Sequence, residues 1–156
     1  MTSFHIAQLN IGRFRYPTDD PRMAAFMDNL DRINALAERS EGFVWRLKDD
    51  SNNATAIRPA SDPTTAVNLS VWESAEALER FVWATVHKQF YNRKGEWFEA
   101  PSKPHFVMWP VEQGHLPSLE EAMARLAHLT ERGDSDFAFG WGHLPHIKMW
   151  MSRKCG

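Results

Sequence analysis

The sequence predicts an α+β fold of the ferredoxin-like, split β-α-β type, formed by a single domain over residues 1–156. The chain is long enough for one core and short for two. Its composition, 43% hydrophobic and 24% charged, is typical of a globular protein. Strand and helix patterns follow the order β-α-β-β-α-β, with an extra C-terminal helix and tail. We expect the core over about residues 4–133 and the tail over 134–156.

The four expected strands are short, rich in apolar residues and bounded by turn residues. The first ends at Gly12. The polar segment 49–65, which contains Pro59 and Pro63, is typical of a loop between the second and third strands. The strands are residues 4–12, 42–48, 66–72 and 104–111.

The three expected helices begin at capping residues and repeat apolar side chains at helical spacing. The first is capped by Asp20, has Pro21 at its first position and ends near Arg39. The second is capped by Ser74, and we expect it to bend near Thr85. The third begins at a capping box and ends at a glycine, with these residues at its ends: Ser118, Glu121 and Gly133.

The expected sheet is antiparallel with helices on one face, which leaves the other face needing cover. Apolar residues occur at both alternations of the first strand, as Leu9 and Ile6 show, so both faces are apolar. We therefore expect a second subunit to cover the open face, giving a homodimer.

Composition argues against several classes of function. No apolar run approaches the ~20 residues of a membrane span. The 18 bases and 20 acids are spread along the chain, so no basic patch for nucleic acid is expected. The N-terminus MTSFHIAQLN lacks a signal-peptide pattern and Cys155 is the only cysteine, which favours a cytoplasmic protein without an internal disulfide. A GxGxxG turn, a Walker loop and a GxSxG elbow are all missing from the sequence.

Polar side chains occupy one face of the two strands that lie at the centre of a ferredoxin-like sheet. Along 66–72 they alternate with three aliphatic residues, and 4–12 repeats the pattern. Buried amides without partners are costly, so this face should hold water, a ligand or a hydrogen-bond network. Asn34 interrupts the apolar stripe of the first helix, where it either ties the helix to Asn10 or faces a pocket. The polar set is Gln8, Asn10, Asn68, Ser70 and Trp72.

His87 lies among aromatic residues in FVWATVHKQFYNRKGEWF (81–98). Trp83 and Tyr91 stand four residues before and after it, so a helix would place the three on one face. An imidazole in such surroundings is kept neutral by desolvation and could accept a proton or bind a metal or haem iron. The alternative is a partly exposed histidine at the edge of an amphipathic helix.

The sequence does not favour a metal site. No histidine pair has the i, i+4 spacing with glutamate of a zinc helix, and there is no Cys/His cluster. His143 and His146, with His115, come nearest to a surface cluster. The repeat of GHLP at 114–117 and 142–145 is interpreted as coincidence.

Three segments resemble a known bacterial family: INALAERSEGFVWRL (33–47), AVNLSVWESAEALERFVWATVHKQFYNRKGEWF (66–98) and FVMWPVEQGHLPSLEEAMARL (106–126). The family is the one catalogued as domain of unknown function 3291, and the resemblance runs to about Gly140. It implies a dimeric α+β barrel related to the antibiotic-biosynthesis monooxygenases, without an established activity.

In that wider superfamily, cofactor-free quinone-forming monooxygenases and haem-degrading monooxygenases place an asparagine on the first strand and a tryptophan near the pocket. The haem enzymes add an iron-ligating histidine on the second helix. Asn10, Trp72 and His87 occupy comparable places here. Ala77 stands where the haem degraders have a tryptophan, so the resemblance favours the cofactor-free oxygenases, which Asn68 and Trp72 resemble more closely.

We expect a small enzyme, monooxygenase-like and cofactor-independent, that acts on an aromatic or otherwise apolar metabolite. His87 or water would take a proton, Asn10 and Asn68 would hold the oxyanion, and Arg93 would supply positive charge. The alternatives are a cyclase or isomerase, a haem-binding protein with His87 as axial ligand, and a non-catalytic ligand-binding module. The expected pocket walls are Trp45, Trp72, Trp83, Tyr91, Trp97 and Trp109.

Overall fold

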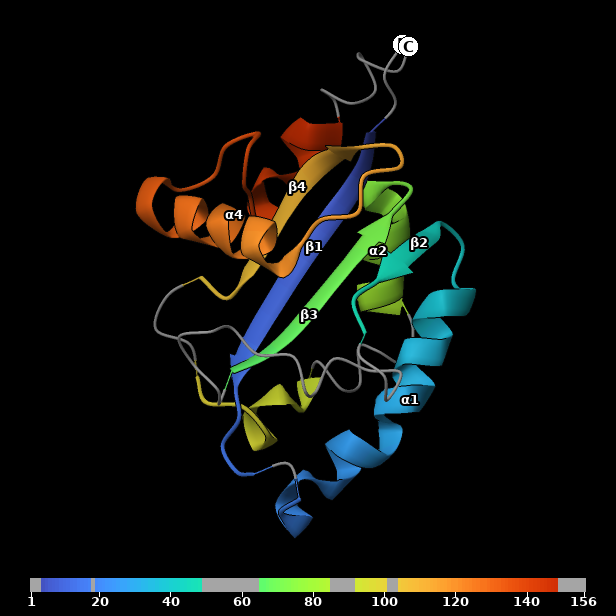
Figure 1. Ribbon diagram of the computed structural model, residues 1–156, viewed down its shortest axis with the longest axis vertical. Coiled ribbons are helices and arrows are strands. Elements are labelled where there is room, and N and C mark those ends of the chain that lie inside the picture. The colour runs from blue at the N-terminus through green and yellow to red at the C-terminus, as the bar shows by residue number, and fades with distance from the viewer. Residues whose placement is uncertain (1–3, 18, 49–64, 85–91, 101–103, 149–156) are drawn as a thin grey trace.

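The computed structural model describes residues 4–17, 19–48, 65–84, 92–100 and 104–148. Its centre is a four-stranded antiparallel sheet in the order β2-β3-β1-β4 (Figure 1). This is the ferredoxin-like order, with β1 and β3 side by side in the middle, so the predicted α+β fold is confirmed. The strands are β1 (Phe4–Arg13), β2 (Phe43–Arg46), β3 (Thr65–Trp72) and β4 (Phe106–Glu112).

The helices begin at the predicted caps. The Asp20 carboxylate accepts a hydrogen bond from the Arg22 backbone N–H at 2.8 Å, but a 3-10 turn, η1 (Pro21–Met23), precedes α1 (Ala24–Arg39). The Ser74 hydroxyl caps α2 (Ala75–Ala84), and the Ser118 hydroxyl caps α4 (Leu119–Arg132). None of the described helices is both long and apolar enough to cross a membrane. The predicted loop 49–65, except Thr65, and the bend near Thr85 lie outside the described residues.

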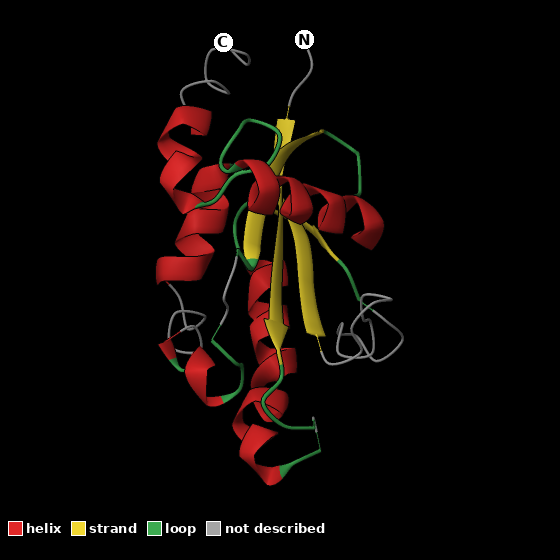
Figure 2. Ribbon diagram, turned by 90° about the vertical axis from the view of Figure 1, so that its left-hand side faces the viewer, coloured by secondary structure: helices red, strands yellow, loops and turns green. Residues whose placement is uncertain are grey.

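The expectation of helices on only one face is wrong, because α4 packs on the face opposite α1 and α2 (Figures 1 and 2). Its apolar stripe buries Leu126 against the β1 and β4 side chains of that face. The β3 residues there, Val67, Leu69 and Val71, are 6%, 1% and 0% exposed in a single chain. The open face that led us to expect a second subunit is therefore covered, and the homodimer stays a prediction of the family resemblance.

The C-terminal segment belongs to the core rather than to a separate tail. The backbone of Phe139 exchanges hydrogen bonds of 2.8 and 3.0 Å with Met108 of β4. Phe139, Leu144 and Ile147 are at most 1% exposed and pack in the same cluster as Trp72. The packed core therefore continues past the predicted boundary at residue 133.

Candidate functional site

A cavity of about 1070 Å³ lies between α1, α2 and the sheet face that carries Gln8, and it extends past the strand ends to α4. This volume is at the upper end of what small-molecule sites offer. Most of its wall is apolar or aromatic, including Ile33, Phe81 and Trp97. The face of the sheet that the sequence marked as polar lines this cavity with Gln8, Asn10, Asn68 and Ser70, and Val67 and Leu69 of the opposite face contribute where the cavity reaches α4.

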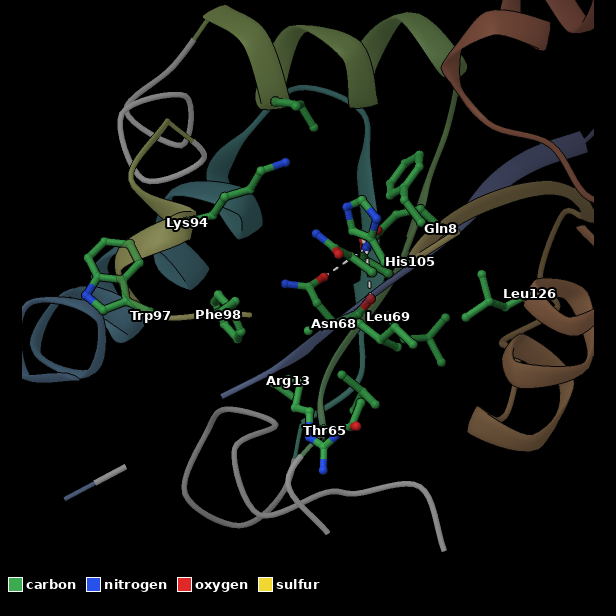
Figure 3. Close-up of a pocket in the computed structure, with 18 of the residues that line it drawn as sticks. Gln8, Arg13, Thr65, Asn68, Leu69, Lys94, Trp97, Phe98, His105 and Leu126 are labelled. Atoms are coloured by element: carbon green, nitrogen blue, oxygen red, sulfur yellow. Dashed lines mark hydrogen bonds between the residues drawn. The ribbon is translucent and has the colours of Figure 1, made fainter. Parts of the chain in front are cut away.

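The polar side chains on the sheet form one hydrogen-bonded group, which we call the polar cluster: Gln8, Asn68, Ser70 and Trp72. Figure 3 labels two of them, Gln8 and Asn68. Strand pairing brings them together, because Gln8 is opposite Ser70 and Asn10 is opposite Asn68. The Gln8 amide donates to Asn68 Oδ1 at 2.8 Å and to Ser70 Oγ at 2.7 Å, and the Trp72 indole donates to Ser70 Oγ at 2.9 Å. Of the three alternatives that the sequence left open for this face (water, a ligand or a hydrogen-bond network), the structure shows the network.

The hydrogen bonds already made determine what the polar cluster can still offer. A serine hydroxyl has two acceptor sites and one donor. Ser70 accepts from both Gln8 and Trp72, so its own O–H remains a donor. The Asn68 side-chain oxygen accepts the hydrogen bond from Gln8, and its NH₂ group has no partner among the described residues. The polar cluster thus presents donors to the cavity, as an oxygen anion requires.

Two of the other amides that line the cavity are Asn10 on β1 and Asn34 on α1. Neither Asn10 nor Asn34 makes a side-chain hydrogen bond to the described part of the chain, although Asn34 is only 9% exposed. The tie between strand and helix that we considered for them does not form within those residues. An amide in such a position needs water or a ligand, which supports the pocket role.

The charges of the lining also favour an anion. Arg46 is 8% exposed and forms an ion pair with Glu38, with Nη2 and Oε1 separated by 3.2 Å. Four cationic and two anionic side chains line the cavity: Arg13, Arg15, Arg46, Lys94, Glu99 and Glu131.

His105 is the one described histidine in the lining, and it enters the cavity from the start of β4 (Figure 3). Partial burial, and then the positive charge of Lys94, lower the pKa of its imidazole below the usual value. Both effects penalise the protonated ring, so His105 is neutral near pH 7 and able to accept a proton.

Aromatic residues close the end of the cavity beside α1. The backbone of residues 97–99 pairs with residues 13–15, and Trp97 is thereby held at 1% exposure. Its ring lies 5.5 Å from that of Phe26, and the Phe98 ring stacks on Phe14 at 5.3 Å. Gly12 permits this approach, since a Cβ there would lie 2.6 Å from the Phe98 ring.

The structure separates the predicted site residues into three groups. Asn10, Asn68, Trp72 and Trp97 line the cavity. His87 and Tyr91 lie outside the described residues, so their roles, including haem ligation by His87, stay predictions. The other four, which do not line the cavity, are Trp45, Trp83, Trp109 and Arg93.

Each of those four has a physical reason to lie elsewhere. Trp45 and Trp109 belong to the core on the opposite face, where the Trp109 indole reaches Glu121 at 3.2 Å. Trp83 is 36% exposed and packs edge-on against Trp141. Arg93 pairs with Glu96 at 2.7 Å, with its guanidinium 4.9 Å from the centre of the Trp97 ring.

Sequence reasoning missed His105, Lys94 and Arg46 as cavity residues. Only strand pairing shows that His105 lies next to β1, where its carbonyl accepts from the Ile11 N–H at 2.8 Å. Arg46 could have been found, because it is a charged residue on a short predicted strand opposite Ser70.

The fold and site define an α+β protein with a ferredoxin-like sheet and a large cavity, lined mostly by apolar and aromatic residues, beside the polar cluster. The chain belongs to the family described as domain of unknown function (DUF3291), whose model matches residues 5–154. This confirms the resemblance found in the sequence. Among curated proteins, no significant match was found.

Solved structures show only distant similarity. A conserved protein from Methanosarcina mazei Go1 shares 12% identity over 67% of this chain and 90% of its own, with a TM-score of 0.49. A mutant of SnoaB, a cofactor-independent oxygenase from Streptomyces nogalater, shares 16% identity over 73% of this chain and 98% of its own, with a TM-score of 0.49. PA3566 from Pseudomonas aeruginosa shares 13% identity over 74% of this chain and 99% of its own, with a TM-score of 0.48. Similarity at this level does not carry an activity to this chain.

Proposed function

We propose that the protein binds a flat aromatic acid, of the phenol or enol type, in this cavity and acts on it as a cofactor-independent oxygenase. The observation that carries the proposal is the polar cluster, which offers the buried Ser70 O–H and the more exposed Asn68 NH₂ as donors in a cavity whose wall is mostly apolar. Donors fixed in a site of low dielectric stabilise an oxygen anion far better than they would in water.

The proposed chemistry begins with proton transfer. Neutral His105 accepts a proton from the ligand, and the resulting oxyanion is held by Asn68 and Ser70. In an anthrone, the enolate formed by loss of a ring methylene proton transfers electrons to O₂ and forms a carbon–oxygen bond. One oxygen atom remains as the new carbonyl, and the other leaves as water with the two methylene hydrogens.

Dithranol, an anthrone with two phenolic hydroxyls, is a suitable probe, because its enolate reduces oxygen without a cofactor. We expect the protein to accelerate oxygen uptake above the spontaneous rate, as measured with an oxygen electrode. Loss of one oxyanion donor in Asn68→Leu should lower kcat by about 100-fold. Gln113→Leu, at an exposed amide outside the cavity, is the matched control and should leave the rate unchanged.

The outcomes distinguish the alternative reactions in the same pocket. Turnover of dithranol without oxygen uptake would move the assignment to a cyclase or isomerase. Tight binding without any turnover would leave a ligand-binding module. Equal rates for the wild type and Asn68→Leu would remove the polar cluster from the mechanism.

A further inference from the structure

Three side chains with metal-ligating atoms converge at the surface, at some distance along the chain from the polar cluster. They are Asp136, in the loop after α4, and two histidines one helical turn apart, His143 and His146. One ligand atom of each lies within 4.8 Å of the other two. The sequence suggested these two histidines together with His115, but His115 instead binds Glu121 at 2.7 Å.

The distances within this cluster suit a shared ion. Asp136 Oδ1 lies 3.2 Å from His143 Nε2 and 3.3 Å from His146 Nε2. With zinc–ligand bonds of 2.0–2.2 Å in tetrahedral geometry, neighbouring ligand atoms are separated by about 3.3–3.5 Å. Two edges of such a tetrahedron are therefore nearly formed. The third edge is still open: the two imidazole rings have centroids 4.9 Å apart, and their ligand atoms lie within 4.8 Å of each other.

The loop that carries Asp136 is held in place by its own hydrogen bonds. The Asp134 carboxylate accepts from the Gly140 N–H at 2.9 Å, and the backbones of Ser135 and Ala138 exchange two hydrogen bonds. The Asp136 carboxylate is thus carried by a short side chain on a backbone that these hydrogen bonds hold in place. Such pre-organisation lowers the entropic cost of binding an ion.

We propose that Asp136, His143 and His146 bind a divalent transition-metal ion, with zinc as the reference ion. Imidazole and carboxylate are ligands that Zn²⁺ accepts, and three protein ligands leave a fourth position for water. Solvent can reach that position, since Asp136 and His146 are 48% and 59% exposed.

A bound ion would fasten the loop 134–138 to the helical turn that follows Trp141. Trp141 stands between the ligands in the chain, lines the cavity and stacks on Phe106 at 5.0 Å. The site is therefore placed to stabilise the segment that forms part of the cavity wall. This effect on stability does not depend on the proposed oxygenase chemistry.

Zinc titration of the untagged, chelator-treated full-length protein by isothermal titration calorimetry tests the proposal. We expect saturable binding of one Zn²⁺ per chain, together with a Tm that rises with zinc concentration. Cobalt in place of zinc should give the intense visible absorption of a four-coordinate site with nitrogen ligands.

Variants localise the site. Because loss of an outer-shell partner already weakens metal binding about 10- to 100-fold, His146→Ala should weaken zinc binding at least about tenfold. Asp136→Asn, which keeps the side-chain shape, should do the same and should abolish the rise in Tm. His115→Ala removes an exposed histidine outside the cluster and serves as the control. Absence of stoichiometric uptake, or uptake that survives both His146→Ala and Asp136→Asn, would overturn the proposal and leave only the polar contacts of Asp136 with the two histidines.

Discussion

Ser70 shows how one hydroxyl defines the character of the cavity. It accepts two N–H bonds at 6% exposure, one from Gln8 and one from the Trp72 indole. Buried donors that lose their acceptor bear the full desolvation cost, whereas removal of both partners is nearly neutral. The hydroxyl therefore satisfies its neighbours as well as offering its own proton to a ligand.

A double-mutant cycle measures this coupling. Ser70→Ala should lower the free energy of unfolding by about 1–3 kcal/mol, because the Trp72 N–H is left unpaired. In the Trp72→Phe background the same change should cost less, since no indole N–H remains. Urea denaturation of the four proteins gives the coupling energy. A zero coupling would show that the Ser70–Trp72 hydrogen bond contributes nothing to stability.

The lowered pKa of His105 predicts how kcat/KM depends on pH. Its pKa is lowered by burial and by Lys94, so the imidazole becomes protonated, and unable to act as a base, only as pH falls below the ordinary value of about 6.5. The acid limb of kcat/KM for dithranol should therefore lie below pH 6.5. Lys94→Met removes a positive charge and should shift that limb to higher pH.

The control for this shift is Lys48→Met, at an exposed lysine outside the cavity, which should leave the limb in place. His105→Gln should lower kcat by about 100-fold or more if the imidazole is the base. An unchanged pH profile in Lys94→Met would contradict the assigned electrostatic contact.

At the residue scale, the polar cluster and Arg46 could be predicted from the sequence, whereas His105 and Lys94 could not. Side chains alternate along a strand with period two, so the position of Asn68 and Ser70 on one face follows from the residues alone. His105 and Lys94 come from segments whose approach depends on tertiary packing. Trp45 and Trp109 were misplaced because aromatic character does not tell one apolar face from the other.

Among the elements, the junction of β2 and α2 depends on a glycine. Gly42 has φ +86° and ends the turn before β2, and a Cβ there would clash with the Ala77 Cβ of α2. Gly114 also has a positive φ, +95°, but nothing lies within 4 Å of its would-be Cβ. Alanine substitutions at these two glycines therefore distinguish the cost of a positive φ from the cost of a steric clash with Ala77.

Gly42→Ala should destabilise the protein by about 2–5 kcal/mol, the sum of about 1–2 kcal/mol for the left-handed backbone and about 1–3 kcal/mol for overpacking. Gly114→Ala should show the backbone part alone. Thermal or urea unfolding of both variants gives the comparison. Equal losses would mean that α2 does not approach β2 as closely as described.

The elements also show why the covering of the second face was missed. The apolar stripe of α4 could be recognised in the sequence, and its residues Ala122 and Leu126 are buried. Periodicity shows that a helix has an apolar side but not which face of the sheet that side meets. That choice depends on the path of the chain after β4.

For the whole molecule, the C-terminal segment is part of the fold. Phe139 is fully buried and pairs with β4, whereas Phe137, two residues away, is 45% exposed. Phe139→Ala should cost about 3–5 kcal/mol of unfolding free energy, because it leaves a cavity in the core. Phe137→Ala, the control, should cost much less, in line with other surface changes. Similar losses of unfolding free energy in both variants would contradict the assignment of the C-terminal segment to the core.

The central claim is that the cavity stabilises an aromatic oxyanion, and the ionisation of a bound phenol tests it most directly. An apolar pocket without donors disfavours the charged form and raises the pKa of a bound phenol, whereas donors that favour the anion lower it. Absorption titration of 4-nitro-1-naphthol with saturating protein reports the phenolate fraction. We predict a bound pKa at least about one unit below the free value, equivalent to about 1.4 kcal/mol, and loss of that shift in Asn68→Leu. A bound pKa equal to or above the free value would contradict the account.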